Sequence, residues 1–266
     1  MTTSDAPRLE VTDLAVRYDR VPALAGVSFT ARAGEVVGVC GPNGSGKSTL
    51  LRAIVGLVPA VAGAVRVAGQ PFARVSHEVS YVPQDAAVDP EFPITVREVV
   101  ATGRMAHRRG LRWPRRGDRE IVDAALAELD LTELADRGLA ELSGGQRQRT
   151  FLARALAQRA GVVLLDEPFA AVDAVTEHEL WQRLRDLARD GAVILVVHHD
   201  LASLAEAADR LLLLSGRLIA DGAPAEALAE ARLEAAYGLP LRHRPGSGGD
   251  GAAAAGRVPA AWAVAR

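Results

Sequence analysis

The chain has 266 residues, with 31 lysines and arginines against 33 aspartates and glutamates, a net charge of −2 and a single cysteine. This balance offers no strong field for nucleic acid or anionic lipid, and one cysteine excludes an internal disulfide and suits a reducing compartment. The first residues lack the pattern of a signal peptide, and the longest apolar runs, 192–197 and 211–214, are too short to span a bilayer. We therefore expect a soluble, cytoplasmic protein that needs a partner for any membrane role.

Short apolar runs alternate with longer helical patterns along the chain. Residues 8–36 and 64–81 alternate polar and apolar side chains, which predicts an antiparallel sheet, whereas residues 36–39 form an apolar run followed by a helical pattern at 48–57. Residues 94–158 contain helical patterns but no convincing strand. Uninterrupted runs at 162–165 and 193–197, separated by a helical pattern at 175–189, are typical of parallel strands covered on both faces. This order predicts a doubly wound α/β core.

The C-terminal stretch, residues 239–266, is rich in glycine and alanine and lacks the apolar density to fold alone, so we expect a disordered tail there. The chain contains no internal repeat, which predicts one folded unit and not two in tandem.

A glycine-rich loop follows the first apolar run. It matches the phosphate-binding pattern Gly-x-x-x-x-Gly-Lys-Ser/Thr, in which glycines let backbone N–H groups surround an anion. Lys47 would reach the β- and γ-phosphates, the Ser48 hydroxyl is placed to ligate Mg²⁺, and a helix starting near Lys47 aims its positive end at the phosphates. Cys40, just before the loop, is interpreted as a small buried residue and not a catalytic thiol. The predicted ATP-binding residues are Gly41, Pro42, Asn43, Gly44, Ser45, Gly46, Lys47, Ser48 and Thr49.

Two further motifs lie more than 90 residues downstream. Ser143 and Gln146 have capping-box spacing, so Ser143 should cap a helix that runs to about Gln158. Capping does not explain Gly144 and Gly145, which cost backbone entropy unless a phosphate must press against their N–H groups. Asp166 ends an apolar run, where its carboxylate can reach Mg²⁺ through water.

Through residues 41–49, 142–146 and 162–168 the chain resembles the ATP-binding subunit of an ABC transporter. The resemblance covers about residues 8–238. It implies an α/β, ABC-type nucleotide-binding domain with a RecA-like parallel-sheet core, an antiparallel β-subdomain and a helical subdomain at about 88–158. It also implies an ATPase that uses ATP and Mg²⁺, with Glu167 polarising the attacking water. Residues Ser143, Gly144, Gly145 and Gln146 would face the ATP of a second subunit, so a head-to-tail homodimer is expected.

The resemblance assigns four weaker positions. Tyr18 would stack on adenine, and Gln84 would contact Mg²⁺ and water and link the core to the helical subdomain; Mg²⁺ would thus be held by Ser48, Gln84 and Asp166. Either of two adjacent histidines could be the switch that reaches the γ-phosphate. His199 is chosen because the family histidine precedes an aspartate. Residues 169–173 correspond to the family's dimer-contact loop. They depart from its commoner Ser-Ala-Leu-Asp form but keep the aspartate, Asp173.

The other histidines and an arginine-rich run have simpler interpretations. The four remaining histidines lack metal-ligand spacing and are interpreted as surface or capping residues; they are His77, His107, His178 and His243. The run at 104–119 is interpreted as a solvated loop of the helical subdomain, so no nucleic-acid partner is expected.

A single cassette without fused membrane helices favours an importer with a separate polytopic permease and, indirectly, a metal-binding lipoprotein. Residues 88–104, 168–173 and 197–201 resemble the manganese/zinc branch of the importers, with iron–siderophore and cobalamin cassettes as the close alternative. A non-transport ATPase assembly is the alternative from another class. We expect the subunit on the cytoplasmic face of the membrane, held there by the permease. Residues 84–103 would transmit the ATP state to the permease, with Phe92 as an apolar anchor.

Overall fold

The computed structural model describes residues 6, 8–84, 93–107, 116–169 and 172–238. Phe92, the middle of the arginine-rich run and the predicted tail at 239–266 lie outside the described residues. None of the helices in the described ranges is long and apolar enough to cross a membrane.

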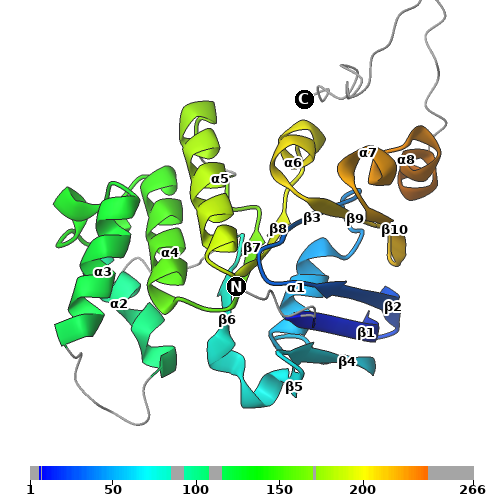
Figure 1. The fold of residues 1–266 in the computed structure, drawn as a ribbon, viewed down its shortest axis with the longest axis horizontal. Coiled ribbons are helices and arrows are strands. Elements are labelled where there is room, and N and C mark those ends of the chain that lie inside the picture. Colours follow the sequence, from blue (N-terminus) through cyan, green and yellow to red (C-terminus); the bar gives the residue numbers. More distant parts are fainter. Residues whose placement is uncertain (1–5, 7, 85–92, 108–115, 170–171, 239–266) are drawn as a thin grey trace, which may run out of the picture.

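A six-stranded sheet forms the centre of the fold, in the order β10-β9-β3-β8-β7-β6 (Figure 1). Its neighbours pair in parallel except β10, which runs antiparallel to β9 at one edge. Every residue of β3, β7 and β8 is buried, as expected for parallel strands with both faces covered. The strands are β3 (Val36–Cys40), β6 (Val79–Val82), β7 (Val162–Asp166), β8 (Val193–Val197), β9 (Arg210–Leu214) and β10 (Leu218–Gly222).

Alternate side chains of this sheet enter two separate cores. In β8, Ile194 and Val196 join the core that includes α4 (Gly144–Gln158), α5 (Ala174–Arg189) and α6 (Leu201–Ala207). Val193, Leu195 and Val197 join the opposite core, with α1 (Lys47–Ile54). Full burial of each such side chain contributes about 1.5–3 kcal/mol. The prediction of a doubly wound α/β core is confirmed.

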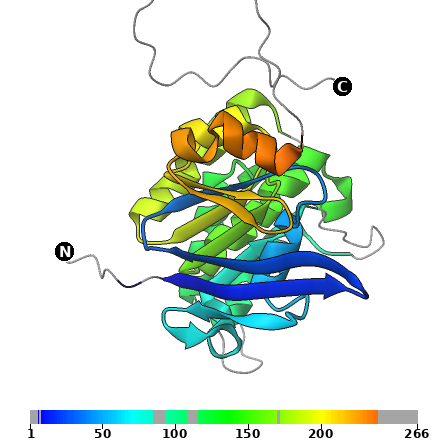
Figure 2. The same cartoon turned by 90° about the vertical axis from the view of Figure 1, so that its right-hand side faces the viewer.

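A second, four-stranded antiparallel sheet covers the α1 side, in the order β2-β1-β4-β5. Its strands are β1 (Leu9–Tyr18), β2 (Val21–Ala31), β4 (Ala62–Val67) and β5 (Gln70–Pro71). The centre of the sheet is β1, where Leu9 lies between Ala31 and Val67. Figure 2 shows this sheet below β9 and β10, on which α7 (Pro224–Ala227) and α8 (Glu230–Tyr237) pack.

The assignment of residues 79–81 to the antiparallel sheet is wrong. After the 3-10 turns η1 (Phe72–Arg74) and η2 (Ser76–Glu78), strand β6 pairs in parallel with β7, Val79 opposite Val162. Ser80, a polar residue of this alternating stretch, is 1% exposed, so the alternation does not mark a surface here. Residue 36 likewise belongs to β3.

The first helix is shorter than predicted. Its pattern suggested 48–57, but α1 ends at Ile54, and Gly56 adopts a left-handed backbone angle of +70° just beyond it. Glycine populates this conformation without a Cβ penalty, which is why helices often end at such a residue.

Helices occupy the region between β6 and β7, as the sequence predicts. They are α2 (Val96–Thr102), η3 (Gly103–His107), α3 (Arg116–Glu128), η4 (Thr132–Leu134), η5 (Leu139–Glu141) and α4. Within the described part of this region the β-structure is limited to an isolated bridge between Thr95 and Gly138. In Figure 1, α2, α3 and α4 gather on one flank of the central sheet, away from β1 and β2.

Candidate functional site

The glycine loop between β3 and α1 packs so closely that side chains are excluded at two positions. A Cβ on Gly41 would lie 2.1 Å from the carbonyl oxygen of Leu214, and one on Gly46 would lie 2.5 Å from Cδ2 of Leu24. Both glycines also have positive φ angles, 144° and 96°. The loop is therefore pressed between β9 and β2, and only glycine fits its curvature.

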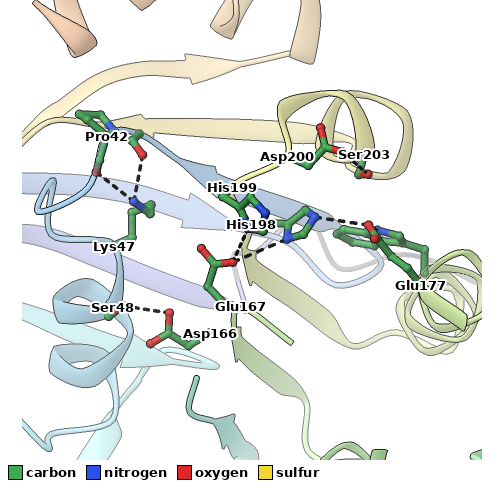
Figure 3. Close-up of polar contacts among 12 residues, drawn as sticks. Pro42, Lys47, Ser48, Asp166, Glu167, Glu177, His198, His199, Asp200 and Ser203 are labelled. Carbon is green, nitrogen blue, oxygen red and sulfur yellow. Dashed lines mark hydrogen bonds and ion pairs between the residues drawn. The ribbon is translucent and has the colours of Figure 1, made fainter. Parts of the chain in front are cut away.

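The polar groups of the loop converge on its concave side. The Nζ atom of Lys47 donates to the carbonyl oxygens of Gly41 and Pro42, at 2.9 and 3.0 Å (Figure 3). Ser45 is 4% exposed, and its hydroxyl has no hydrogen-bond partner among the described residues. Burial lowers the pKa of Lys47, while the negative charge of Glu167 raises it. An ammonium and a buried unpaired hydroxyl at the start of a helix form a site suited to a phosphate.

Tyr18 lies beside this loop at the end of β1. Its hydroxyl is 3.4 Å from Oγ1 of Thr49, and the residue is 46% exposed, so part of it is accessible to a ligand. The structure thus brings together the predicted adenine contact and the predicted phosphate loop. Asn43 and Gly44 form the exposed tip of that loop.

Oxygen donors for a divalent cation lie between α1 and β7. The Ser48 hydroxyl donates to Oδ1 of Asp166 at 3.0 Å, and the Tyr81 hydroxyl donates to Oδ2 at 3.4 Å. Asp166 is fully buried; burial raises the pKa of its carboxyl, and the hydrogen bond from Ser48 opposes that shift. A hydroxyl and a carboxylate are ligands that Mg²⁺ prefers, so these residues fit the ion. Gln84 is exposed just after β6, the strand next to β7.

Glu167 turns away from its neighbour Asp166. Its φ is +51°, an uncommon value for a non-glycine residue, and its backbone N–H donates to the carbonyl oxygen of Val197 at 3.0 Å. The two consecutive carboxylates therefore enter different surroundings: Asp166 faces Ser48, and Glu167 faces the two histidines after β8 (Figure 3). Backbone strain of this kind costs on the order of 1–3 kcal/mol and is concentrated at functional sites.

The adjacent histidines have different environments. The side chain of His199 is 65% exposed, and its Nδ1 lies 2.7 Å from Oε2 of Glu167. His198 is 2% exposed; its Nδ1 lies 3.9 Å from the same Oε2, and its Nε2 lies 3.3 Å from Oε1 of Glu177. The structure therefore brings Glu167 and His199 together, and it leaves the His199 ring accessible to a ligand.

The buried pair formed by His198 and Glu177 is not predicted from the sequence. His198 was considered only as the other candidate for the switch, and Glu177 was not singled out. Glu177 lies one helical turn before Trp181, whose Nε1 donates to Oε1 of Glu177 at 3.3 Å. The Glu-x-x-x-Trp spacing on α5 is a usable signal for such a contact.

The predicted capping box at the start of α4 is confirmed. The Ser143 hydroxyl accepts from the Gln146 backbone at 3.3 Å, and Oε1 of Gln146 accepts from the Ser143 backbone at 3.0 Å. Ser143 and Gly144 are exposed, and none of the hydrogen bonds among described residues joins this helix start to the loop at 41–49. The helix itself packs in the core opposite the one that contains α1.

The other predicted residues have ordinary structural partners. Asp173 caps α5, accepting from the backbone of Val175 and Thr176. Cys40 is fully buried, as predicted, and desolvation raises the pKa of its thiol to about 12. His77 and His178 lie at the surface; the other two predicted surface histidines, His107 and His243, have side chains outside the described part.

Comparisons with known proteins agree with this geometry. The family model described as "ABC transporter" matches residues 24–170. The chain is 44% identical to the zinc transport system ATP-binding protein TroB of Treponema pallidum, over 89% of each chain. It is 40% identical to the manganese transport system ATP-binding protein MntB of Bacillus subtilis, over 86% of this chain and 92% of the relative. The solved ADP conformation of MJ1267, an ATP-binding cassette of an ABC transporter, is similar with a TM-score of 0.74 and 26% identity, over 87% of this chain and 98% of that one.

Proposed function

Because the chain belongs to the ABC transporter family, we propose that it is the ATP-hydrolysing subunit that powers uptake of manganese or zinc through a separate membrane permease. The observation that carries the proposal is the convergence, at the carboxyl ends of β3, β7 and β8, of the phosphate loop, the Ser48–Asp166 pair and the Glu167–His199 pair. The names of the relatives support manganese or zinc as the cargo.

The loop residues bind the substrate, ATP. Backbone N–H groups of residues 41–49 and the Lys47 ammonium hold the phosphates, which compete for the ammonium with the carbonyl oxygens of Gly41 and Pro42. Tyr18 stacks on the adenine. Mg²⁺ would be held by Ser48, Gln84 and Asp166, and when bound it neutralises charge on the β- and γ-phosphates.

Glu167 acts as the base in hydrolysis. Its carboxylate orients a water molecule and accepts its proton while the water oxygen bonds to the γ-phosphorus; the bond from that phosphorus to the bridging oxygen breaks, and ADP leaves. His199, whose Nδ1 lies 2.7 Å from Oε2 of Glu167, orients this carboxylate and donates to the γ-phosphate. Catalysis of this kind depends on positioning and charge stabilisation more than on covalent chemistry.

A second copy of the chain completes each site. The N–H groups of Gly144 and Gly145 lie at an exposed helix start away from this chain's own loop, so they are available to the ATP of a partner in a head-to-tail homodimer. Asp173, at the start of α5, lies in the proposed dimer-contact loop.

The cassette, residues 8–238 with a helical subdomain at about 88–158, would sit on the cytoplasmic face of the membrane through its permease. Residues 84–103 connect Gln84 to α2, the first helix of that subdomain. A metal-binding lipoprotein would deliver the ion on the other side.

The test measures metal uptake into proteoliposomes that contain the full chain together with the permease and the binding protein encoded beside it. We expect ATP-dependent accumulation of Mn²⁺ or Zn²⁺, and none with Lys47→Ala. Parallel assays with an iron–siderophore complex and with cobalamin test the alternative. Uptake of a chelate without Mn²⁺ or Zn²⁺ would replace the proposed cargo, and ATPase activity without uptake of any of them would favour a non-transport role.

A further inference from the structure

A histidine that the ATPase mechanism does not use lies buried beside the catalytic carboxylate. His198 is 2% exposed, yet neither ring nitrogen makes a hydrogen bond of good geometry with the described residues. Buried polar groups are normally hydrogen-bonded, so an imidazole whose nitrogens lie near carboxylates only at 3.3 and 3.9 Å needs an explanation. Packing against Phe169 and Trp181, at ring-centroid distances of 5.4 and 6.3 Å, accounts for its carbon atoms but not for its nitrogens.

One nitrogen of His198 faces two other metal-ligating side chains. Glu167, His198 and His199 each offer a ligand atom, and these three atoms lie within 4.8 Å of one another. In tetrahedral zinc sites, metal–ligand bonds of about 2.0–2.2 Å separate the ligand atoms by about 3.3 Å. The distances from Oε2 of Glu167, 2.7 Å to Nδ1 of His199 and 3.9 Å to Nδ1 of His198, bracket that value. Small side-chain rotations would bring the three to a common ion.

The other nitrogen of His198 has the neighbour that a metal-bound histidine requires. Its Nε2 lies 3.3 Å from Oε1 of Glu177 (Figure 3). That oxygen also accepts from Nε1 of Trp181. Metal-ligating histidines almost always turn their second nitrogen toward a carboxylate or carbonyl, which fixes the ring and raises its basicity. Glu177 is therefore in place as an outer-shell partner.

From this geometry we propose that Glu167, His198 and His199 bind a zinc-class transition-metal ion in the nucleotide-free subunit, and that this ion inhibits ATP hydrolysis. Two imidazoles and one carboxylate select Zn²⁺ over Mg²⁺, which prefers oxygen ligands. The exposed ring of His199 leaves room for water as a fourth ligand. An ion there occupies the carboxylate that must accept the proton from water, so hydrolysis stops. If the protein powers metal uptake as proposed above, the imported ion would inhibit further import through this site. Only this last step rests on the proposed uptake function.

The binding test uses the full chain, stripped of metal and nucleotide, titrated with Zn²⁺ by calorimetry. We expect one Zn²⁺ per chain at these residues, with no comparable binding of Mg²⁺. His198→Phe keeps an aromatic ring against Phe169 and Trp181, and it should weaken Zn²⁺ binding at least about tenfold. His199→Ala, at an exposed side chain, should do the same and serves if His198→Phe does not fold. His178→Phe is the matched control because His178 is an exposed histidine on the same helix as Glu177.

The inhibition test measures ATPase rates at MgATP concentrations below saturation, so that the nucleotide-free subunit is populated, with increasing free Zn²⁺. The wild type should lose activity and recover it with a chelator, whereas His198→Phe should need at least about tenfold more Zn²⁺ to lose half of its own rate. Unchanged Zn²⁺ affinity in both His198→Phe and His199→Ala would overturn the site, and binding without inhibition would overturn its regulatory role. Neither result depends on transport, so the proposed uptake function stands or falls separately.

Discussion

Nδ1 of His199 lies 2.7 Å from Oε2 of Glu167, although the two residues are 32 positions apart. The contact follows from the pairing of β7 with β8, in which Asp166 is opposite Val197, so the residues after each strand emerge side by side. Glu167 therefore lies at the carboxyl ends of the parallel strands, where the phosphate loop follows β3. A carboxylate held in one orientation is what a general base requires.

Replacing Glu167 by glutamine should separate hydrolysis from binding. The amide keeps the shape of the side chain but cannot accept a proton, so turnover should fall by about 10²–10⁴-fold. ATP affinity should remain within a few-fold, and ATP should trap a dimer detectable by size-exclusion chromatography. Glu179→Gln, an exposed change on α5, is the control. Hydrolysis at the wild-type rate by Glu167→Gln would rule out the assigned base.

Lys47 is the only lysine in the chain, which makes its exposure to reagents directly measurable. Because phosphates would occupy the space around its ammonium, MgATP should protect it from acylation, as read by peptide mass spectrometry. Lys47→Ala should weaken ATP binding about 10–100-fold, the loss expected for a hydrogen bond to a charged group. Arg66→Ala, at an exposed residue of β4, should leave binding unchanged. Equal labelling with and without MgATP would place the phosphates elsewhere.

Ser143 offers a way to distinguish helix capping from dimer formation. Ser143→Ala removes the side-chain acceptor of the capping box and should lower the free energy of unfolding by about 1 kcal/mol, measured by urea denaturation. Ser143→Asp should retain the cap, since aspartate is an equally good N-cap residue. Its charge would repel the phosphates of ATP on a partner, so ATP-dependent dimerisation should be lost despite wild-type stability. Dimerisation by Ser143→Asp would contradict the assigned interface.

Cys40 should be inert in the folded protein. Burial raises the pKa of its thiol to about 12, so at pH 8 the folded chain should resist alkylation by iodoacetamide and the urea-unfolded chain should react. The same pKa shift makes the free energy of unfolding depend on pH. Above the unfolded pKa, near 9, the unfolded chain releases a proton that the folded chain retains until about pH 12. Stability should therefore decline as the pH rises through that window, and less so in Cys40→Ala. Rapid alkylation of the native protein would contradict this.

Local patterns were sufficient for much of this protein. The phosphate loop, the capping box at Ser143 and the buried runs at 162–165 and 193–197 could all be identified from the sequence, because each depends on side chains within a few residues of one another. Gly41 and Gly46 are required by the positive φ angles of the loop as well as by close contacts with Leu214 and Leu24. The family resemblance then assigned the two regions that break the strand–helix alternation to an antiparallel β-subdomain and a helical subdomain.

Tertiary structure decided the features that depend on long-range pairing. The pattern of β6 fits either sheet, and only its pairing with β7 places it in the parallel one. Similarly, the turn after β8 and the packing of α5 determine that His198 is buried beside Glu177 while His199 remains exposed at Glu167. The aspartate that follows His199 distinguishes the two histidines in the sequence, but it does not indicate which ring is buried. The direction each side chain faces is decided by contacts with elements that lie far away along the chain.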